Sequence, residues 1–108
     1  MEEKKKSFYC YILKLNPAFY RKEDWTEKEA ELVGIHFNYL KELTEKGILF
    51  LAGRTVNEPM TEKDLGIAIL ETESEEEAEN YMKNDPAVKG GLMTAELFKF
   101  SLALLRNS

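Results

Sequence analysis

The sequence predicts a single α+β domain of the ferredoxin-like type, spanning residues 1–108, with two helices on one face of an antiparallel sheet. Two observations lead to this fold class. Four apolar segments have the composition of strands, and two helix-capping sequences divide them into the order β-α-β-β-α-β. The length of 108 residues also fits one domain, which is large enough to fold without disulfides or metal.

Residues 7–15 predict the first strand because aromatic and branched side chains dominate them. Both alternating sets of side chains are apolar, which is typical of a strand buried on both faces. One set consists of Phe8, Cys10 and Ile12, and the other of Tyr9, Tyr11 and Leu13. Asn16 and Pro17 end the strand.

The first helix is predicted to begin at Thr26 and to continue to Lys46. Residues 26–29 read Thr-Glu-Lys-Glu, a capping box in which the threonine and glutamate oxygens accept hydrogen bonds from free backbone amides. Gly47 then supplies the residue that commonly follows the last turn of a helix.

Two further strands are expected at residues 48–54 and 65–71, separated by a polar loop. A second capping box at residues 74–77 opens the second helix, and its glutamates favour the positive end of the helix dipole. Residues 84–86, Asn-Asp-Pro, stop this helix because a residue before proline avoids the helical conformation. We expect a turn at residues 88–91.

The last strand is predicted at residues 93–104. One of its faces is apolar throughout, with Phe98, Phe100, Leu102 and Leu104. Because the helices cover only one side of the sheet, the other side would expose an apolar patch, which usually marks an interaction surface. We therefore expect a homodimer that pairs through the open sheet face. The alternative is a twisted monomer with an amphipathic open face.

The composition excludes several classes of protein. Hydrophobic residues make up 44% and charged residues 32%, a balance typical of a globular chain. The net charge of −5 argues against nucleic acid as the main partner. No segment has the pattern of a signal peptide or a membrane span, so we expect a cytoplasmic protein. The short basic run at residues 4–6 indicates that residues 1–6 form a disordered N-terminus.

His36 is the only histidine, and it falls in the apolar stripe of the first helix with Leu32, Tyr39, Leu40 and Leu43. Burying its polar ring costs free energy unless the ring gains a hydrogen bond. Histidine is also the natural general acid or base near neutral pH. The two interpretations are a core histidine bonded to backbone and a catalytic base.

Asp85 precedes Pro86 and has two interpretations of its own. It is typical of a residue that caps a short helix or turn, with proline at the first helical position. It is also a candidate for the carboxylate that orients His36 and fixes its tautomer.

Three further residues are candidates for substrate binding. Arg54 ends the second strand and is suited to binding a carboxylate, although an ordinary solvated arginine has the same pattern. Gly53 beside it permits a bulge or a close backbone approach. The tyrosines of the first strand are expected to be packing residues, with Tyr11 as a candidate to line a pocket.

No cofactor or metal is expected. The single cysteine, Cys10, excludes an internal disulfide, and its apolar surroundings indicate an inert buried thiol. One histidine leaves only carboxylates as metal ligands, and these fall mainly on solvated helix faces. Residues 90–91, Gly-Gly, lack the spacing and the lysine of a phosphate-binding loop.

These segments together resemble the YCII (YciI-like) family of small dimeric α/β-barrel proteins over residues 8–104. The matching segments, in order, are 36–40 (HFNYL), 51–54 (LAGR), 66–71 (GIAILE), 74–78 (SEEEA), 84–88 (NDPAV) and 91–92 (GL). The resemblance implies a ferredoxin-like fold, a dimer with sheets packed face to face, and an active site centred on His36 and Asp85. A family member of known activity removes chloride from a chlorinated hydroxyquinone, and similar folds include muconolactone isomerases.

Two departures from the family pattern bear on substrate choice. The segment 16–25 is longer than usual, which we expect to reshape the mouth of a pocket. Arg54 stands where many members have proline, so the substrate specificity of the family does not carry over.

The leading interpretation is a small-molecule enzyme of lyase or isomerase type, with a small anionic or aromatic ligand. His36 would transfer the proton, Asp85 would orient it, and Arg54 would hold an anionic group. The alternatives are a non-catalytic dimeric module that binds a ligand or a protein, and an inert oligomerisation unit. The enzyme hypothesis predicts that the His36 ring faces a cavity within hydrogen-bond reach of Asp85, directly or through one water.

Overall fold

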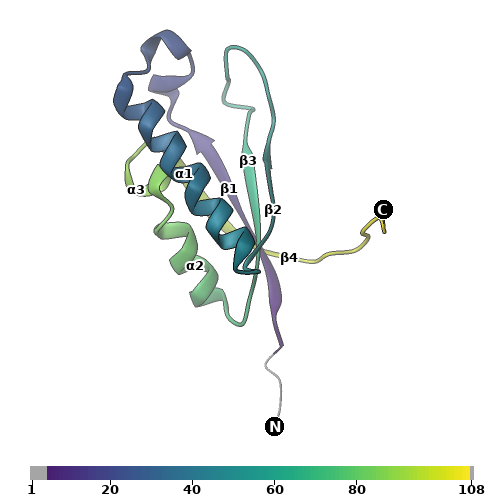
Figure 1. Ribbon diagram of the computed structural model, residues 1–108. Coiled ribbons are helices and arrows are strands. Elements are labelled where there is room, and N and C mark those ends of the chain that lie inside the picture. Colours follow the sequence, from purple (N-terminus) through teal and green to yellow (C-terminus); the bar gives the residue numbers. More distant parts are fainter. Residues whose placement is uncertain (1–4, 108) are drawn as a thin grey trace.

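The computed structural model describes residues 5–107, which form a four-stranded antiparallel sheet with helices on one face (Figure 1). The elements in chain order are β1 (Ser7–Leu15), α1 (Glu27–Glu45), β2 (Leu49–Arg54), β3 (Gly66–Thr72), α2 (Glu75–Lys83), α3 (Pro86–Lys89) and β4 (Met93–Phe100). Two short 3-10 turns, η1 (Pro17–Phe19) and η2 (Lys22–Asp24), lie between β1 and α1. The predicted disordered N-terminus lies mostly outside the described residues.

The strands lie in the order β2-β3-β1-β4, and each adjacent pair is antiparallel, which confirms the α+β ferredoxin-like fold. The central strand β1 pairs with β3 and β4, so that Tyr11 lies opposite Ala68 on one side and Leu97 on the other. The bulge that glycine permits does not occur at Gly53, which pairs with Ile67 in regular register. The register shifts earlier in β2, between Leu49 and Leu51.

Capping sets the ends of the long helix as predicted. The Thr26 hydroxyl accepts a hydrogen bond from the Lys28 amide, and Glu29 accepts one from the Thr26 amide at 2.6 Å. These bonds to Thr26 hold the pKa of Glu29 below its ordinary value. After the last turn, Gly47 takes a positive φ of 77°, a backbone conformation that suits glycine.

Two predictions about the C-terminal half are wrong. The chain forms the short helix α3 at Pro86–Lys89, where a turn was expected to begin at residue 88. The last strand ends at Phe100 instead of residue 104. Phe100 pairs with Phe8, close to the start of β1, so the following residues have no strand beside them to pair with. They lead away from the sheet in Figure 1.

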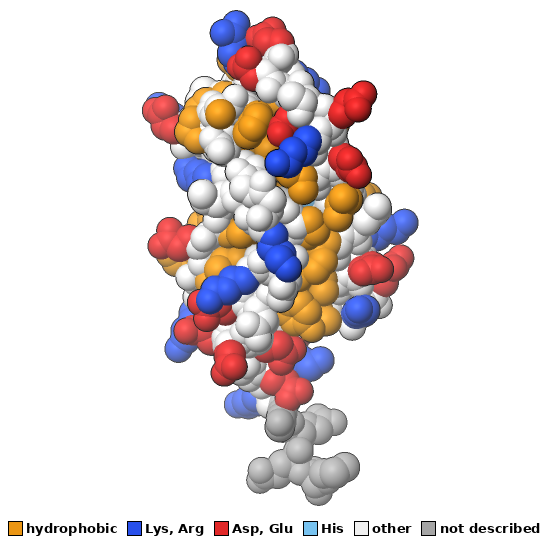
Figure 2. Space-filling view, turned by 90° about the vertical axis from the view of Figure 1, so that its left-hand side faces the viewer, with side chains coloured by type: hydrophobic (Ala, Val, Ile, Leu, Met, Phe, Trp, Pro, Cys, Tyr) orange, Lys and Arg blue, Asp and Glu red, His pale blue; other side chains and the backbone are white. Residues whose placement is uncertain are grey.

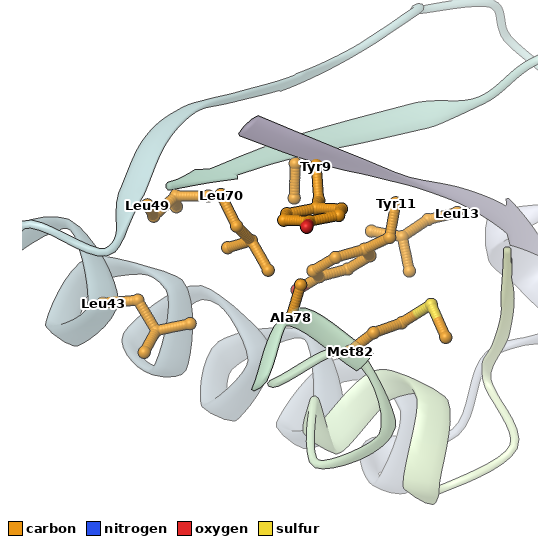
Figure 3. Close-up of a cluster of buried hydrophobic side chains, with 9 residues drawn as sticks. Tyr9, Tyr11, Leu13, Leu43, Leu49, Leu70, Ala78 and Met82 are labelled. Atoms are coloured by element: carbon orange, nitrogen blue, oxygen red, sulfur yellow. The ribbon is translucent and has the colours of Figure 1, made fainter. Parts of the chain in front are cut away.

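The core lies between the sheet and the helices (Figure 3). Its buried members are Tyr9, Tyr11, Leu13, Leu43, Leu49, Ala68, Leu70, Ala78 and Met82. On the helical side of the molecule, hydrophobic side chains gather in the middle of the face, where several lysine or arginine side chains cross them, and acidic side chains lie mostly toward the outline (Figure 2). On the opposite side of the sheet, Leu51 and Phe98 stay 47% and 42% exposed. Within residues 5–107, no helix has both the length and the apolar character needed to cross a bilayer.

Candidate active site

The structure brings together His36 and Asp85, which are 49 residues apart in the sequence. Nδ1 of His36 lies 2.6 Å from Oδ1 of Asp85. The histidine side chain is 12% exposed and the aspartate side chain is fully buried. A hydrogen bond this short, between an imidazole and a carboxylate, is typical of a charge-assisted interaction.

Asp85 reaches His36 because it is also the N-terminal cap of α3. Its Oδ1 accepts a hydrogen bond from the Ala87 amide at 3.0 Å, and Pro86 occupies the first helical position. The two interpretations of Asp85 therefore apply at once: the same carboxylate caps a helix and holds the histidine. Capping fixes its position on the backbone, which gives it little freedom to turn away.

Close packing of α1 against α3 keeps His36 next to Asp85. Leu32 lies one turn before His36 on α1, and it packs against Gly90 at the end of α3. A Cβ atom at Gly90 would lie 2.8 Å from Cδ2 of Leu32, a distance that side chains do not tolerate. Glycine at position 90 therefore allows the approach that places His36 over Asp85.

Tyr11 lies behind Asp85, away from the cavity. The prediction that it lines a pocket does not match its placement, because its side chain is 0% exposed. Its hydroxyl donates to Oδ2 of Asp85 at 2.8 Å. Burial, and then the nearby charge of Asp85, raise the pKa of Tyr11 far above its ordinary value. The hydroxyl therefore keeps its proton and acts as a permanent donor.

The Asp85 carboxylate thus accepts three hydrogen bonds, from His36, Ala87 and Tyr11. Within residues 5–107 it forms no ion pair with a lysine or an arginine. A buried carboxylate needs such donors if it is to remain ionised. Both Asp85 oxygens already accept hydrogen bonds, from Ala87 and Tyr11, so Nδ1 of His36 is the donor to Oδ1, and in the singly protonated ring Nε2 is left as an acceptor.

His36 lines a cavity of about 820 Å³ between α1, β2 and the loops beside them. The described residues offer no hydrogen-bond partner to Nε2, and no buried side-chain nitrogen or oxygen among them lacks one, so Nε2 is on the open side of the ring. The cavity wall is mainly apolar. Its aromatic members are Phe19, Tyr20, Trp25, Phe37 and Phe50.

Two loops form the mouth of this cavity. The segment 16–25 contributes Phe19, Tyr20 and Trp25, which places this segment in the cavity wall. The Trp25 indole donates to the Phe19 carbonyl at 2.8 Å, which fixes the ring in place. The Met60 amide donates to the Tyr20 carbonyl at 3.2 Å and joins this segment to the β2–β3 loop.

Arg54 and Gly53 also line the cavity. The nearest partners of the Arg54 guanidinium are the Thr55 carbonyl, 3.4 Å away, and the sulfur of Met60, 3.9 Å away. It forms no ion pair within residues 5–107, so its charge is available to a ligand. No atom lies within 4 Å of a Cβ at Gly53, but this open space is on the opposite face of β2 from the Arg54 side chain, because Gly53 pairs with Ile67 and Arg54 with Gly66.

Sequence reasoning identified His36 and Asp85 but missed the contact of Tyr11 with Asp85. The sequence holds little indication of this contact, because Tyr9 and Tyr11 belong to the same alternating set and both fit a packing role. Cys10 is buried, and burial raises the pKa of its thiol. No group of three or more histidine, cysteine or acidic side chains in the described part of the chain is arranged to hold a metal ion.

Comparison with known proteins identifies the family. The model of the YCII-related domain matches residues 7–101, and the chain therefore belongs to the YCII family. Among solved structures, it is similar to the 5-chloro-2-hydroxyhydroquinone dehydrochlorinase from Burkholderia phenoliruptrix AC1100, in complex with 2,5-dihydroxybenzoquinone. The TM-score is 0.65 at 22% identity, over 89% of this chain and 95% of that one, which shows a shared fold. A search of curated proteins found no match.

Proposed function

We propose that this YCII-family protein is a small-molecule enzyme of lyase or isomerase type, with His36 as its general base and acid. One observation carries the proposal. His36 is bonded through Nδ1 to a buried carboxylate, at 2.6 Å, and presents Nε2 to a cavity of about 820 Å³. A base needs this arrangement, because it must be oriented from behind and open to substrate in front.

In the proposed mechanism, Nε2 of His36 removes a proton from a carbon or hydroxyl group of the substrate. The electron pair left behind forms a new double bond. In a lyase reaction a leaving group departs with its own bonding pair, whereas in an isomerase reaction Nε2 returns the proton at another position. Asp85 stabilises the imidazolium ion that forms in either case, since its charge lies 2.6 Å from Nδ1.

The cavity favours a planar ring that carries oxygen substituents. Its aromatic wall suits stacking against such a ring. Arg54 forms no ion pair within residues 5–107, so its guanidinium would bind an enolate, phenolate or carboxylate oxygen of the ligand. The compound bound by the structurally similar dehydrochlorinase, 2,5-dihydroxybenzoquinone, has this chemistry and is a suitable probe.

A second candidate function is a non-catalytic module that binds a ligand or a protein. Apolar side chains at the rim of the cavity favour it. Phe37 and Val56 are 65% and 71% exposed, although both line the cavity. In this case His36 would be a hydrogen-bonding residue of the binding site and no turnover would occur.

The test separates binding from turnover. Binding of 2,5-dihydroxybenzoquinone is measured by calorimetry, and turnover is measured on a panel of chlorinated hydroquinones and lactones. We expect His36→Gln to bind the probe within a few-fold of the wild type and to lose at least about 100-fold in turnover. Glu42→Gln, an exposed change on α1 away from the cavity, is the matched control and should leave both unchanged.

Two results would contradict the proposal. Equal turnover by the wild type and His36→Gln would remove His36 from the mechanism. Probe binding without turnover of any panel member would favour the binding module.

A further inference from the structure

The buried side chain of Tyr11 carries a hydroxyl group that packing does not require, because phenylalanine would fill the same space. Its ring points from β1 into the core near Ala78 and Met82 (Figure 3) and is fully buried. Burying a hydroxyl costs free energy unless it forms a hydrogen bond. The hydroxyl forms that bond with Oδ2 of Asp85, 74 residues away in the sequence, so it contributes to the candidate site.

The two oxygens of Asp85 have different partners. Oδ1 accepts hydrogen bonds from Nδ1 of His36 and from the Ala87 amide. Within residues 5–107, Oδ2 accepts one only from Tyr11. Tyr11 therefore fixes the second oxygen, and with it the plane in which the carboxylate faces the imidazole.

No other phenol substitutes for it. Tyr39 lies on α1, where burial first, and then the nearby charge of Asp85, raises its pKa to about 12. Its hydroxyl, however, donates to the Tyr81 carbonyl at 2.8 Å. Loss of the Tyr11 hydroxyl would therefore leave Oδ2 buried without a donor, and such an oxygen is costly to keep.

We infer that Tyr11 is a positioning residue of the site: by holding Oδ2 of Asp85, it keeps Oδ1 on the Nδ1 proton of His36 and keeps Nε2 free toward the cavity. The inference deepens the proposed function and rests on it for its catalytic meaning. Which ring nitrogen of His36 carries the proton can be measured without any substrate.

The single histidine makes this measurement direct, because its two ring nitrogens give only two signals in ¹⁵N-histidine-labelled protein. At about pH 9, where imidazole is ordinarily neutral, we expect the wild type to show a protonated Nδ1 and an unprotonated Nε2. In Tyr11→Phe we expect the second tautomer to become populated. The Nδ1 proton should also exchange with water about tenfold faster, as the loss of one buried hydrogen bond allows.

Tyr9→Phe is the matched control. Tyr9 lies two residues away on the same face of β1 and belongs to the same core, but its hydroxyl makes no hydrogen bond to another described residue. In Tyr9→Phe we expect the ¹⁵N signals of His36 and the exchange rate of its Nδ1 proton to equal those of the wild type. Unchanged signals in Tyr11→Phe, or the same change in both variants, would overturn the inference.

If Tyr11→Phe does not fold, a measurement on the wild type alone tests the inference. The Tyr11 hydroxyl proton should then appear as a slowly exchanging signal, with a nuclear Overhauser effect to the Nδ1 proton of His36. Absence of that signal would overturn the inference. A wild type with the expected tautomer but no turnover would contradict the proposed function only, and turnover with a tautomer unaffected by Tyr11→Phe would contradict the positioning role only.

Discussion

Asp64 organises the β2–β3 loop, which forms one side of the cavity mouth. Its buried carboxylate accepts hydrogen bonds from the side chains of Thr55, Asn57 and Thr61 and from the Thr61 amide, at 2.8 to 3.1 Å. These bonds, the one from Thr55 first, hold its pKa below the ordinary value. The unfolded chain therefore binds more protons at this residue than the folded one.

The stabilisation by Asp64 is therefore present above about pH 4 and is lost as the pH falls through the lowered pKa. We expect Asp64→Asn to lower the urea midpoint of unfolding at pH 7, because its amide presents hydrogens where Oδ2 accepts two bonds. The difference from the wild type should shrink as the pH falls below about 4. Glu62→Gln, an exposed change in the same loop, is the control, and a difference that does not depend on pH would contradict this account.

Asp85 shows what a single position in a sequence can and cannot reveal. The Asp-Pro pair predicted a helix cap, and α3 has that cap. The contact with His36 was expected from the family resemblance, because local sequence holds no information about a partner 49 residues away. His36 itself was identified because a polar ring in an apolar helical stripe needs a compensating bond.

At the level of elements, the site depends on how closely α1 and α3 approach. Gly90→Ala would place a Cβ 2.8 Å from Cδ2 of Leu32 and 3.0 Å from the Pro86 carbonyl oxygen. The end of the leucine side chain must turn away and the Pro86 carbonyl must give slightly, so we expect a loss of about 1 to 3 kcal/mol in the free energy of unfolding. The bond between His36 and Asp85 should lengthen, which the exchange rate of the Nδ1 proton reports.

Gly34→Ala is the control for that change, because it makes the same substitution on α1 where no atom lies within 4 Å of the new Cβ. Alanine is the better helix former, so this variant should be more stable by about 0.5 to 1 kcal/mol. Equal stability of the two alanine variants in urea unfolding would show that the fit at Gly90 is not tight.

The elements also show which signals in a sequence are local. The capping box at Thr26 and the glycine at position 47 predicted both ends of α1, because caps act within one turn. The end of β4 was predicted four residues too late. Its apolar alternation continues past Phe100, but pairing stops where β1 begins, and no local pattern contains that information.

At the scale of the whole molecule, the sheet separates two surfaces with different properties. The helical side holds the core, the His36–Asp85 pair and the cavity wall formed by α1. The other side has no covering layer within residues 5–107, and its apolar side chains include Phe98 together with Phe50 and Leu51, which lie on the edge strand β2 and also border the cavity. Phe50 packs edge-on against Phe8 with ring centroids 5.4 Å apart, so the patch extends across the width of the sheet.

We propose that a second copy of the chain covers this face. An apolar patch of this kind favours association, and a twofold pair lets each copy cover the other with the same residues. Because both copies carry the substitution, Phe98→Lys would place two charges in such an interface. We expect the wild type to sediment as a dimer at micromolar concentration, and the Kd of the variant to rise at least about 100-fold.

Ile35→Lys is the matched control for the dimer, because Ile35 is as exposed as Phe98, 46% against 42%, but lies on α1 on the helical side. It should leave the Kd unchanged. A monomeric wild type, or dissociation caused by Ile35→Lys and not by Phe98→Lys, would contradict pairing through the sheet.

If the dimer forms as proposed, dissociation by Phe98→Lys should leave the His36 tautomer intact, because Asp85, Ala87 and Tyr11 all belong to the same chain as His36.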